Sequence, residues 1–143
     1  MVSAAELFNP VKKRASEQAY AMDALKRLRR LKVKCRREAA ILGRSADLVF
    51  LREGEVCSVE MKLHDWKRAL AQARDHKLAV DRAYVCLPGK RVTQTMLEHA
   101  EAMGVGFLIY NDSDDWPFRV GQDAPSESVL SPTVRERILK SLR

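Results

Sequence analysis

Two short apolar runs separated by a polar turn constrain the fold of this chain more than any other feature. The runs cover residues 46–51 and 55–62, and their interiors are rich in Val, Leu and Phe. Arg52, Glu53 and Gly54 form the polar turn between them. Apolar runs of this length bounded by turn residues are typical of β-strands. We therefore predict an antiparallel hairpin here.

The turn also predicts the register of the hairpin. If Glu53 and Gly54 centre it, the numbers of opposed residues sum to 107, which places Asp47 opposite Glu60. Directly opposed side chains on one face of an antiparallel pair lie about 5 Å apart. Because side chains alternate between the faces of a strand, Lys62 shares a face with Glu60. The hairpin thus predicts a patch of two carboxylates and one ammonium group.

Opposed carboxylates are destabilising unless another charge offsets them. A hard divalent cation would do so, because it takes oxygen ligands of this kind. The alternative interpretation is a solvated salt-bridge face, which Glu-x-Lys triplets on strands commonly form. The strand that carries Asp47 is apolar on both sides of that residue, and this favours a functional site.

Positive charge is concentrated near the N-terminus. Residues 12–37 contain eleven Lys and Arg against the two acids Glu17 and Asp23, a local net charge of +9 in a chain whose net charge is +7. A cluster of this kind is typical of nucleic-acid binding. A solvated helix face that only aids solubility is the alternative.

The rest of the chain alternates predicted helices and strands. We predict a helix that starts at Asn9 and Pro10 and runs to about Arg30. Glu17 lies on its inward face. There the Glu17 carboxylate either pairs with a basic neighbour or joins the carboxylate patch as a further ligand. A second helix, capped by Asp65, places Gln72 and His76 on one face. These two side chains either flank the carboxylate patch and touch a phosphate or base, or form a surface pair without a role. The remaining predictions are strands at 33–42, 82–87 and 105–110, a helix from Thr93 to Gly104, a polar loop or linker at 111–130 and a C-terminal helix at 131–143.

Several features indicate a single-domain cytoplasmic protein. Cys35, Cys57 and Cys86 lie in apolar runs without metal-ligand spacing, as expected of reduced core cysteines. The first residues lack the layout of a signal peptide, and no apolar run is long enough to span a bilayer. The apolar stripe of the C-terminal helix either packs on the domain or mediates self-association into a homodimer.

The motif Asp47…Glu60-Met61-Lys62, together with this order of elements, resembles the PD-(D/E)XK nuclease superfamily, which includes restriction endonucleases and archaeal-type Holliday junction resolvases. The resemblance covers residues 1–110 as a nuclease-like core. It implies an α/β fold with a mixed central sheet flanked by helices, in the restriction-endonuclease-like order αβββαβ with an added αβ. Ala46 stands where the nominal proline of the motif would be, a position that varies widely in the superfamily.

The resemblance also implies roles for individual residues. Asp47, Glu60 and the backbone carbonyl of Met61 would hold Mg²⁺, for which Mn²⁺ would substitute. Glu17 matches an acid on the first helix that serves as an extra ligand in several members. Lys62 would position or activate the attacking water, and Gln72, followed one turn later by His76, matches a Gln that many members carry on the helix after the lysine.

The function implied is that of a Mg²⁺-dependent deoxyribonuclease, a hydrolase that cleaves phosphodiester bonds of DNA through a metal-activated water. The alternative is a DNA-binding module on the same fold that does not cleave.

Overall fold

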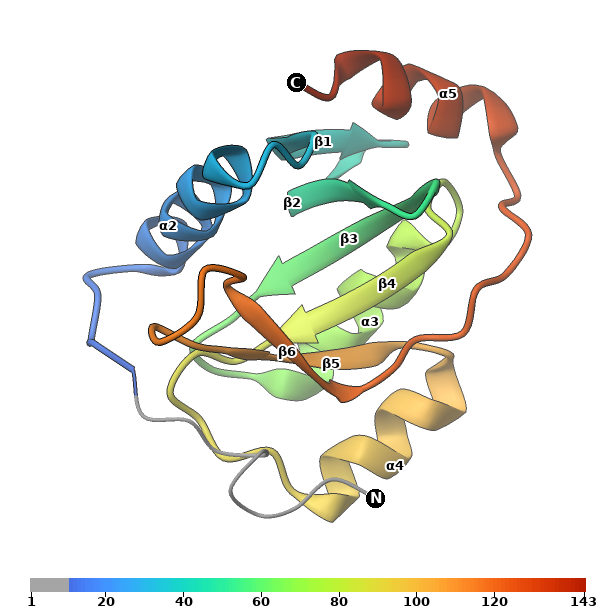
Figure 1. Cartoon of the computed structure of the whole chain (residues 1–143). Helices are drawn as coiled ribbons and strands as arrows, with labels where there is room; N and C mark the ends of the chain where they lie inside the picture. The colour runs from blue at the N-terminus through green and yellow to red at the C-terminus, as the bar shows by residue number, and fades with distance from the viewer. Residues whose placement is uncertain (1–10) are drawn as a thin grey trace.

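The computed structural model describes residues 11–143, which form a six-stranded mixed sheet with helices on both faces (Figure 1). The strands lie in the sheet in their chain order, from β1 to β6. The strands are β1 (Cys35–Ile41), β2 (Arg44–Arg52), β3 (Glu55–Met61), β4 (Arg82–Cys86), β5 (Gly106–Tyr110) and β6 (Phe118–Gln122). The helices are α2 (Glu17–Arg30), α3 (Trp66–His76), α4 (Gln94–Met103) and α5 (Pro132–Ser141). The predicted α/β class and the order of its elements are confirmed.

Two apolar clusters hold the layers together. α2 packs on one face of the sheet through Tyr20, Ala24 and Leu28, which join a cluster that includes Leu48 and Val59. On the other face, α3, α4 and α5 cover a second cluster, to which they contribute Ala69, Leu70, Ala73, Leu97, Ala100, Val134 and Ile138. A sheet buried on both faces explains why the central strands are almost continuously apolar.

The β2–β3 hairpin has the predicted register. Leu48 pairs with Val59 and Arg52 pairs with Glu55, so opposed residue numbers sum to 107 as expected. The two turn residues, Glu53 and Gly54, have φ values of 52° and 79°. Two successive positive φ values are typical of the tight turns that match the twist of a hairpin, which explains why the register does not slip.

The β1–β2 pair contains an irregularity that the sequence does not signal. Glu38 has a φ of 53°, and the ladder passes from Arg37↔Leu48 to Ala39↔Ala46 without a Glu38–Asp47 pair. Leu48 belongs to the α2-side cluster, whereas Ala46 belongs to the α3-side cluster. The alternation of side chains therefore breaks at Asp47, which lies at the kink.

The crossovers after the hairpin follow the prediction. β3 pairs with β4 and β4 pairs with β5 in parallel, with α3 and α4 as the connections. Asp65 caps α3 by accepting a hydrogen bond from the backbone amide of Arg68, and Thr93 caps α4. Gly104 ends α4 in the left-handed conformation with a φ of 69°, as predicted.

Two boundaries differ from the prediction. The first helix begins at Glu17, where the Ser16 side chain caps the backbone amide of Ala19, and the predicted start at Asn9 and Pro10 lies outside the described residues. The segment 111–130 is not only loop, because it contains β6, which pairs antiparallel with β5. The short apolar stretch at Phe118 is surrounded by Asp, Ser, Pro and Gly, and this composition hid the strand.

The C-terminal helix packs on the domain. Val134, Ile138 and Leu142 of its apolar stripe are buried in the α3-side cluster, so this stripe is not free for a second copy. All three cysteines are buried and free of disulfides. Within residues 11–143 no helix has the length and apolar character needed to cross a membrane.

Candidate functional site

The candidate site lies where β2 and β3 run past the kink toward the carboxyl end of β3. Oδ2 of Asp47 accepts a hydrogen bond of 2.8 Å from the backbone amide of Met61. This contact joins the first acid of the motif to the strand that carries Glu60. The two carboxyl groups are within hydrogen-bond reach of each other. The β2–β3 pairing nevertheless ends at Leu48 and Val59, so the predicted direct pairing of Asp47 with Glu60 is not part of the ladder, and Asp47 contacts the backbone of Met61 instead.

Glu60 is buried, with 6% of its surface exposed. Burial, followed by the charge of Asp47 and a hydrogen bond to its carboxyl group, raises the pKa of Glu60 to about 8. Oε2 of Glu60 has no hydrogen-bond partner within residues 11–143. A buried carboxylate oxygen without a partner is costly, so this atom is suited to a cation that supplies the missing interaction.

The pKa of Asp47 is also raised, chiefly by burial. The hydrogen bond from Met61 and the contact with Glu60 oppose this shift, as does the charge of Lys62. Two carboxyl groups this close cannot both ionise easily, so they share a proton at neutral pH. A divalent cation would release that proton, because ligands must be deprotonated to bind.

Lys62 lies directly after β3, and its backbone amide donates a 3.0 Å hydrogen bond to the carbonyl of Cys86 on β4. The charge of its ammonium group lowers the pKa of both Asp47 and Glu60. Lys62 is therefore within electrostatic reach of both acids, as the alternation of strand side chains predicted. Lys62 is half-buried.

Glu17 reaches the site from the first turn of α2. Its Oε2 accepts a 2.8 Å hydrogen bond from the backbone amide of Leu63, and its charge raises the pKa of Asp47 and Glu60. No ion pair to Glu17 is present in the part of the chain described. Of the two interpretations of this inward acid, its position favours the one that brings it to the carboxylate patch.

α3 carries both Gln72 and His76, and it brings His76 against Glu60. Nε2 of His76 lies 3.8 Å from Oε2 of Glu60. His76 is only 1% exposed, and burial lowers its pKa to about 4, so the imidazole is neutral at pH 7. An enclosed side chain cannot touch a phosphate or base, and it is not a surface residue either. His76 therefore packs behind Glu60.

Three further buried polar atoms of α3 and β3 lack a hydrogen-bond partner among residues 11–143. They are Oε1 of Gln72, Nδ1 of His76 and Oγ of Ser58. Ser58 lies two residues before Glu60 and so faces the same side of β3. Sequence reasoning missed Ser58, although a lone hydroxyl in an apolar strand was the available signal.

The residues present fit a divalent cation of the magnesium type. Among residues 11–143, no group of three or more His, Cys, Asp and Glu side chains is arranged to hold a metal ion. Mg²⁺ usually keeps several waters and binds through one or two carboxylates. Asp47 and Glu60 supply two, and Met61, which directly follows Glu60, offers a backbone carbonyl. The partnerless oxygen of Glu60 is the observation that favours the fit.

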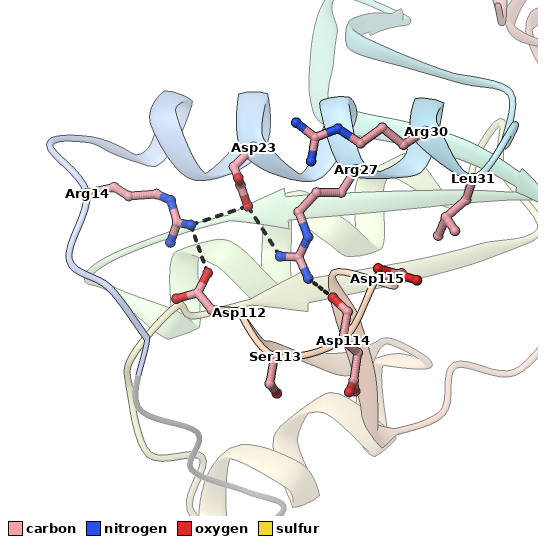
Figure 2. Close-up of a pocket in the computed structure, with 9 residues that line it drawn as sticks. All are labelled: Arg14, Asp23, Arg27, Arg30, Leu31, Asp112, Ser113, Asp114 and Asp115. Atoms are coloured by element: carbon pink, nitrogen blue, oxygen red, sulfur yellow. Dashed lines mark hydrogen bonds and ion pairs between the residues drawn. The ribbon is translucent and has the colours of Figure 1, made fainter.

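A separate pocket of about 480 Å³ lies between α2 and the loop from β5 to β6 (Figure 2). Here Arg27 is neutralised, because Nη1 lies 3.3 Å from Oδ2 of Asp23 and donates a 2.6 Å hydrogen bond to the carbonyl of Asn111. Arg14 is paired with Asp23 and Asp112 at 3.4 and 2.8 Å. Part of the basic cluster at residues 12–37 therefore anchors this loop, a structural role that sequence reasoning did not assign.

Comparison with known proteins gives limited support. No protein-family model matches the chain, and no curated protein matches it. The solved structure of SfsA from Pyrococcus furiosus in complex with Ca²⁺ is similar, with 15% sequence identity and a TM-score of 0.40. The similarity covers 78% of this chain and 63% of the SfsA chain, so this chain spans less than two thirds of that protein. At this level the comparison carries no functional conclusion.

Proposed function

We propose that this protein is a Mg²⁺-dependent nuclease that hydrolyses phosphodiester bonds of DNA. The observation that carries the proposal is the arrangement of Asp47, Glu60 and Lys62 around the end of β3. Burial and mutual repulsion hold the pKa of the Glu60 carboxyl at about 8, and one of its oxygens is buried without a partner. Two carboxyl groups buried side by side do not stabilise the fold. A bound cation that neutralises their charge would explain why both are present.

In this proposal each residue has a defined task. Asp47, Glu60 and the carbonyl of Met61 would hold the metal ion, and Glu17 of α2 would serve as a further ligand. Mg²⁺, or Mn²⁺ in its place, would lower the pKa of a bound water and neutralise charge on the phosphoryl oxygens. Lys62 holds the attacking water beside the scissile phosphate and stabilises the negative charge that develops there.

Two residues of α3 support this arrangement from behind. His76 stays neutral and fills the space behind Glu60, which restricts the carboxyl group to one orientation. Gln72 offers a buried carbonyl oxygen that would accept a hydrogen bond from an ordered water. In this proposal both act as positioning residues.

A non-cleaving DNA-binding module is the second candidate. The observation that favours it is that Asp47 and Glu17 are each engaged with a backbone amide, and that no set of three acids is arranged for a metal among residues 11–143. Such a module would bind DNA equally well with and without a divalent ion, whereas a nuclease requires the ion for turnover.

The test is a cleavage assay with purified protein on linear duplex, branched and single-stranded DNA, in Mg²⁺, in Mn²⁺ and in chelator. We expect cleavage of at least one substrate that requires the ion and is lost in Glu60→Gln. Glu101→Gln, which changes an exposed acid of α4, is the matched control and should cleave like the parent. Binding without cleavage of any substrate in either metal would favour the second candidate.

A further inference from the structure

A second pocket, of about 370 Å³, lies between α2, β1 and α5, away from the carboxylates. It is lined by Arg29, Cys35, Arg36, Lys140, Ser141 and Arg143. Four of these six residues are cationic and none is acidic. α2 and β1 are consecutive in the chain, whereas Lys140, Ser141 and Arg143 come from its C-terminal end, so the fold brings these last residues to the cluster.

Backbone pairing at the free edge of β1 assembles this pocket. The amide of Cys35 donates a 3.1 Å hydrogen bond to the carbonyl of Arg143, and the amide of Arg143 donates one of 3.4 Å to the carbonyl of Cys35. The end of α5 is anchored in turn by burial of Ile138 and Leu142. Lys140 and Arg143 are thus held beside Arg36 of β1.

The charge of this pocket differs from that of the pocket in Figure 2. There, the cationic side chains of Arg14, Arg27 and Arg30 are more than balanced by the four acids Asp23, Asp112, Asp114 and Asp115. In the second pocket no Asp or Glu side chain lines the wall, and none of the four cationic side chains is among the ion pairs of residues 11–143. Convergent cationic side chains with no acidic side chain beside them attract an anion.

We propose that this pocket binds a backbone phosphate of the nucleic-acid substrate, remote from the bond that is cleaved. The proposal rests on the proposed function for the identity of the substrate, and it assigns to α5 a role in binding. Glu17 and Arg29 lie near opposite ends of α2, about 18 Å apart along the helix axis at about 1.5 Å per residue. At about 3.4 Å per nucleotide of one strand, that distance corresponds to roughly five nucleotides.

The proposal predicts a length dependence. A dinucleotide bound at the carboxylate site is too short to reach the second pocket even when it is fully extended, whereas a strand of about sixteen nucleotides is long enough. Loss of one cation from the pocket should therefore weaken only the longer ligand. Shape and base sequence should have little influence, because contacts to phosphates carry no sequence information.

Fluorescence anisotropy with labelled single strands of both lengths, in Ca²⁺ to suppress turnover, provides the test. We expect Lys140→Gln to bind the longer strand about fivefold more weakly and the shorter strand like the parent, an effect typical of one lost charge contact. Arg137→Gln is the matched control, because it removes the same charge from an exposed position of α5 outside the pocket. Arg36→Gln should reproduce the effect of Lys140→Gln from a different element.

A second experiment distinguishes a site for nucleic acid from a site that binds any small anion. Titration with inorganic pyrophosphate, followed by the NMR signals of the Cys35, Arg36 and Ser141 amides, reports occupancy of the pocket without any cleavage. Pyrophosphate binding with unchanged affinity of Lys140→Gln for the longer strand would overturn the proposal and leave an adventitious anion site. Equal weakening for both lengths, or for Arg137→Gln as well, would also overturn it. A parent that binds as expected but never cleaves would contradict the proposed function and leave this site intact.

Discussion

The backbone amide of Met61 donates a hydrogen bond of 2.8 Å to Oδ2 of Asp47, and this bond fixes the first acid of the site to the strand that carries the second. The contact lies at the point where the β1–β2 ladder skips a pair beside Glu38. It leaves the rest of the Asp47 carboxyl directed toward Glu60. The site therefore depends on the kink as well as on the hairpin.

Both acids should be required for metal binding. We predict that Asp47→Asn and Glu60→Gln each lose Mn²⁺ binding in isothermal titration calorimetry, because each removes one of two carboxylate ligands. Glu101→Gln serves as the control at an exposed acid. Circular dichroism should show that all three variants keep the fold. If both site variants bound Mn²⁺ like the parent, the metal would have to lie elsewhere.

The stability of the metal-free protein should depend on pH through Glu60. Its pKa is raised from 4.5 to about 8 on folding, so between these values the folded state holds more protons than the unfolded state. Stability from this group is therefore fully present at low pH and is lost as pH rises toward 8. His76, whose pKa is lowered from 6.5 to about 4, has the opposite effect, but only below about pH 6.5.

The window from pH 6.5 to 8 thus reports mainly on the carboxyl pair formed by Glu60 and Asp47. We expect urea unfolding in chelator to show a decrease of about 1 kcal/mol in the free energy of unfolding across this window. The decrease should be absent in Glu60→Gln, and Mg²⁺ should abolish it in the parent. An equal decrease in parent and variant would show that another group is responsible.

Arg27 should contribute to stability more than to DNA binding. It donates hydrogen bonds to the carbonyls of Asn111 and Trp116 and pairs with Asp23. We predict that Arg27→Gln lowers the free energy of unfolding by about 2 kcal/mol, because it leaves the carbonyl of the buried residue Asn111 without its charged donor. Its exposed neighbour Arg30, changed to Gln, should alter stability by less than about 0.5 kcal/mol. Similar urea midpoints for the two variants would contradict this role.

The exposed part of the basic cluster at residues 12–37 should still provide DNA affinity. Log affinity should fall with log salt concentration at about −0.9 per contacted duplex phosphate. We expect the double variant Arg30→Gln and Lys34→Gln to flatten that slope by up to about 2. The double variant Arg74→Gln and Arg137→Gln removes the same charge from exposed positions outside the cluster. Identical slopes for the parent and both double variants would show that the cluster is solvated surface.

The hairpin and its register could be predicted because they depend on neighbouring residues. Glu53 and Gly54 supply the turn, and the apolar runs on either side supply the strands. The caps at Asp65, Thr93 and Gly104 were predictable for the same reason. Each of these features is encoded within a few residues of where it acts.

Other features depend on tertiary contacts and were not predictable. A left-handed Glu38 carries no sequence signal, so the kink that positions Asp47 was missed. The hydrogen bond from the Leu63 amide to Glu17 joins residues 46 positions apart. Only the fold shows that Glu17 lies near the carboxylate patch, and not beside a basic partner among residues 11–143. The strand β6 was hidden by its polar neighbours, and the pocket shared by Arg29 and Lys140 required the placement of α5.

The most direct test of the proposed mechanism is the single-turnover rate of Mg²⁺-dependent DNA cleavage by Lys62→Ala, measured with saturating enzyme. Lys62 lies beside both acids without holding the metal, so its loss should remove the chemical step and leave DNA binding in Ca²⁺ and Mn²⁺ binding unchanged. Lys67→Ala, at an exposed lysine near the start of α3, is the control and should cleave like the parent. We predict a decrease in rate of at least about a hundredfold for Lys62→Ala. Cleavage by Lys62→Ala at the parental rate would contradict the mechanism.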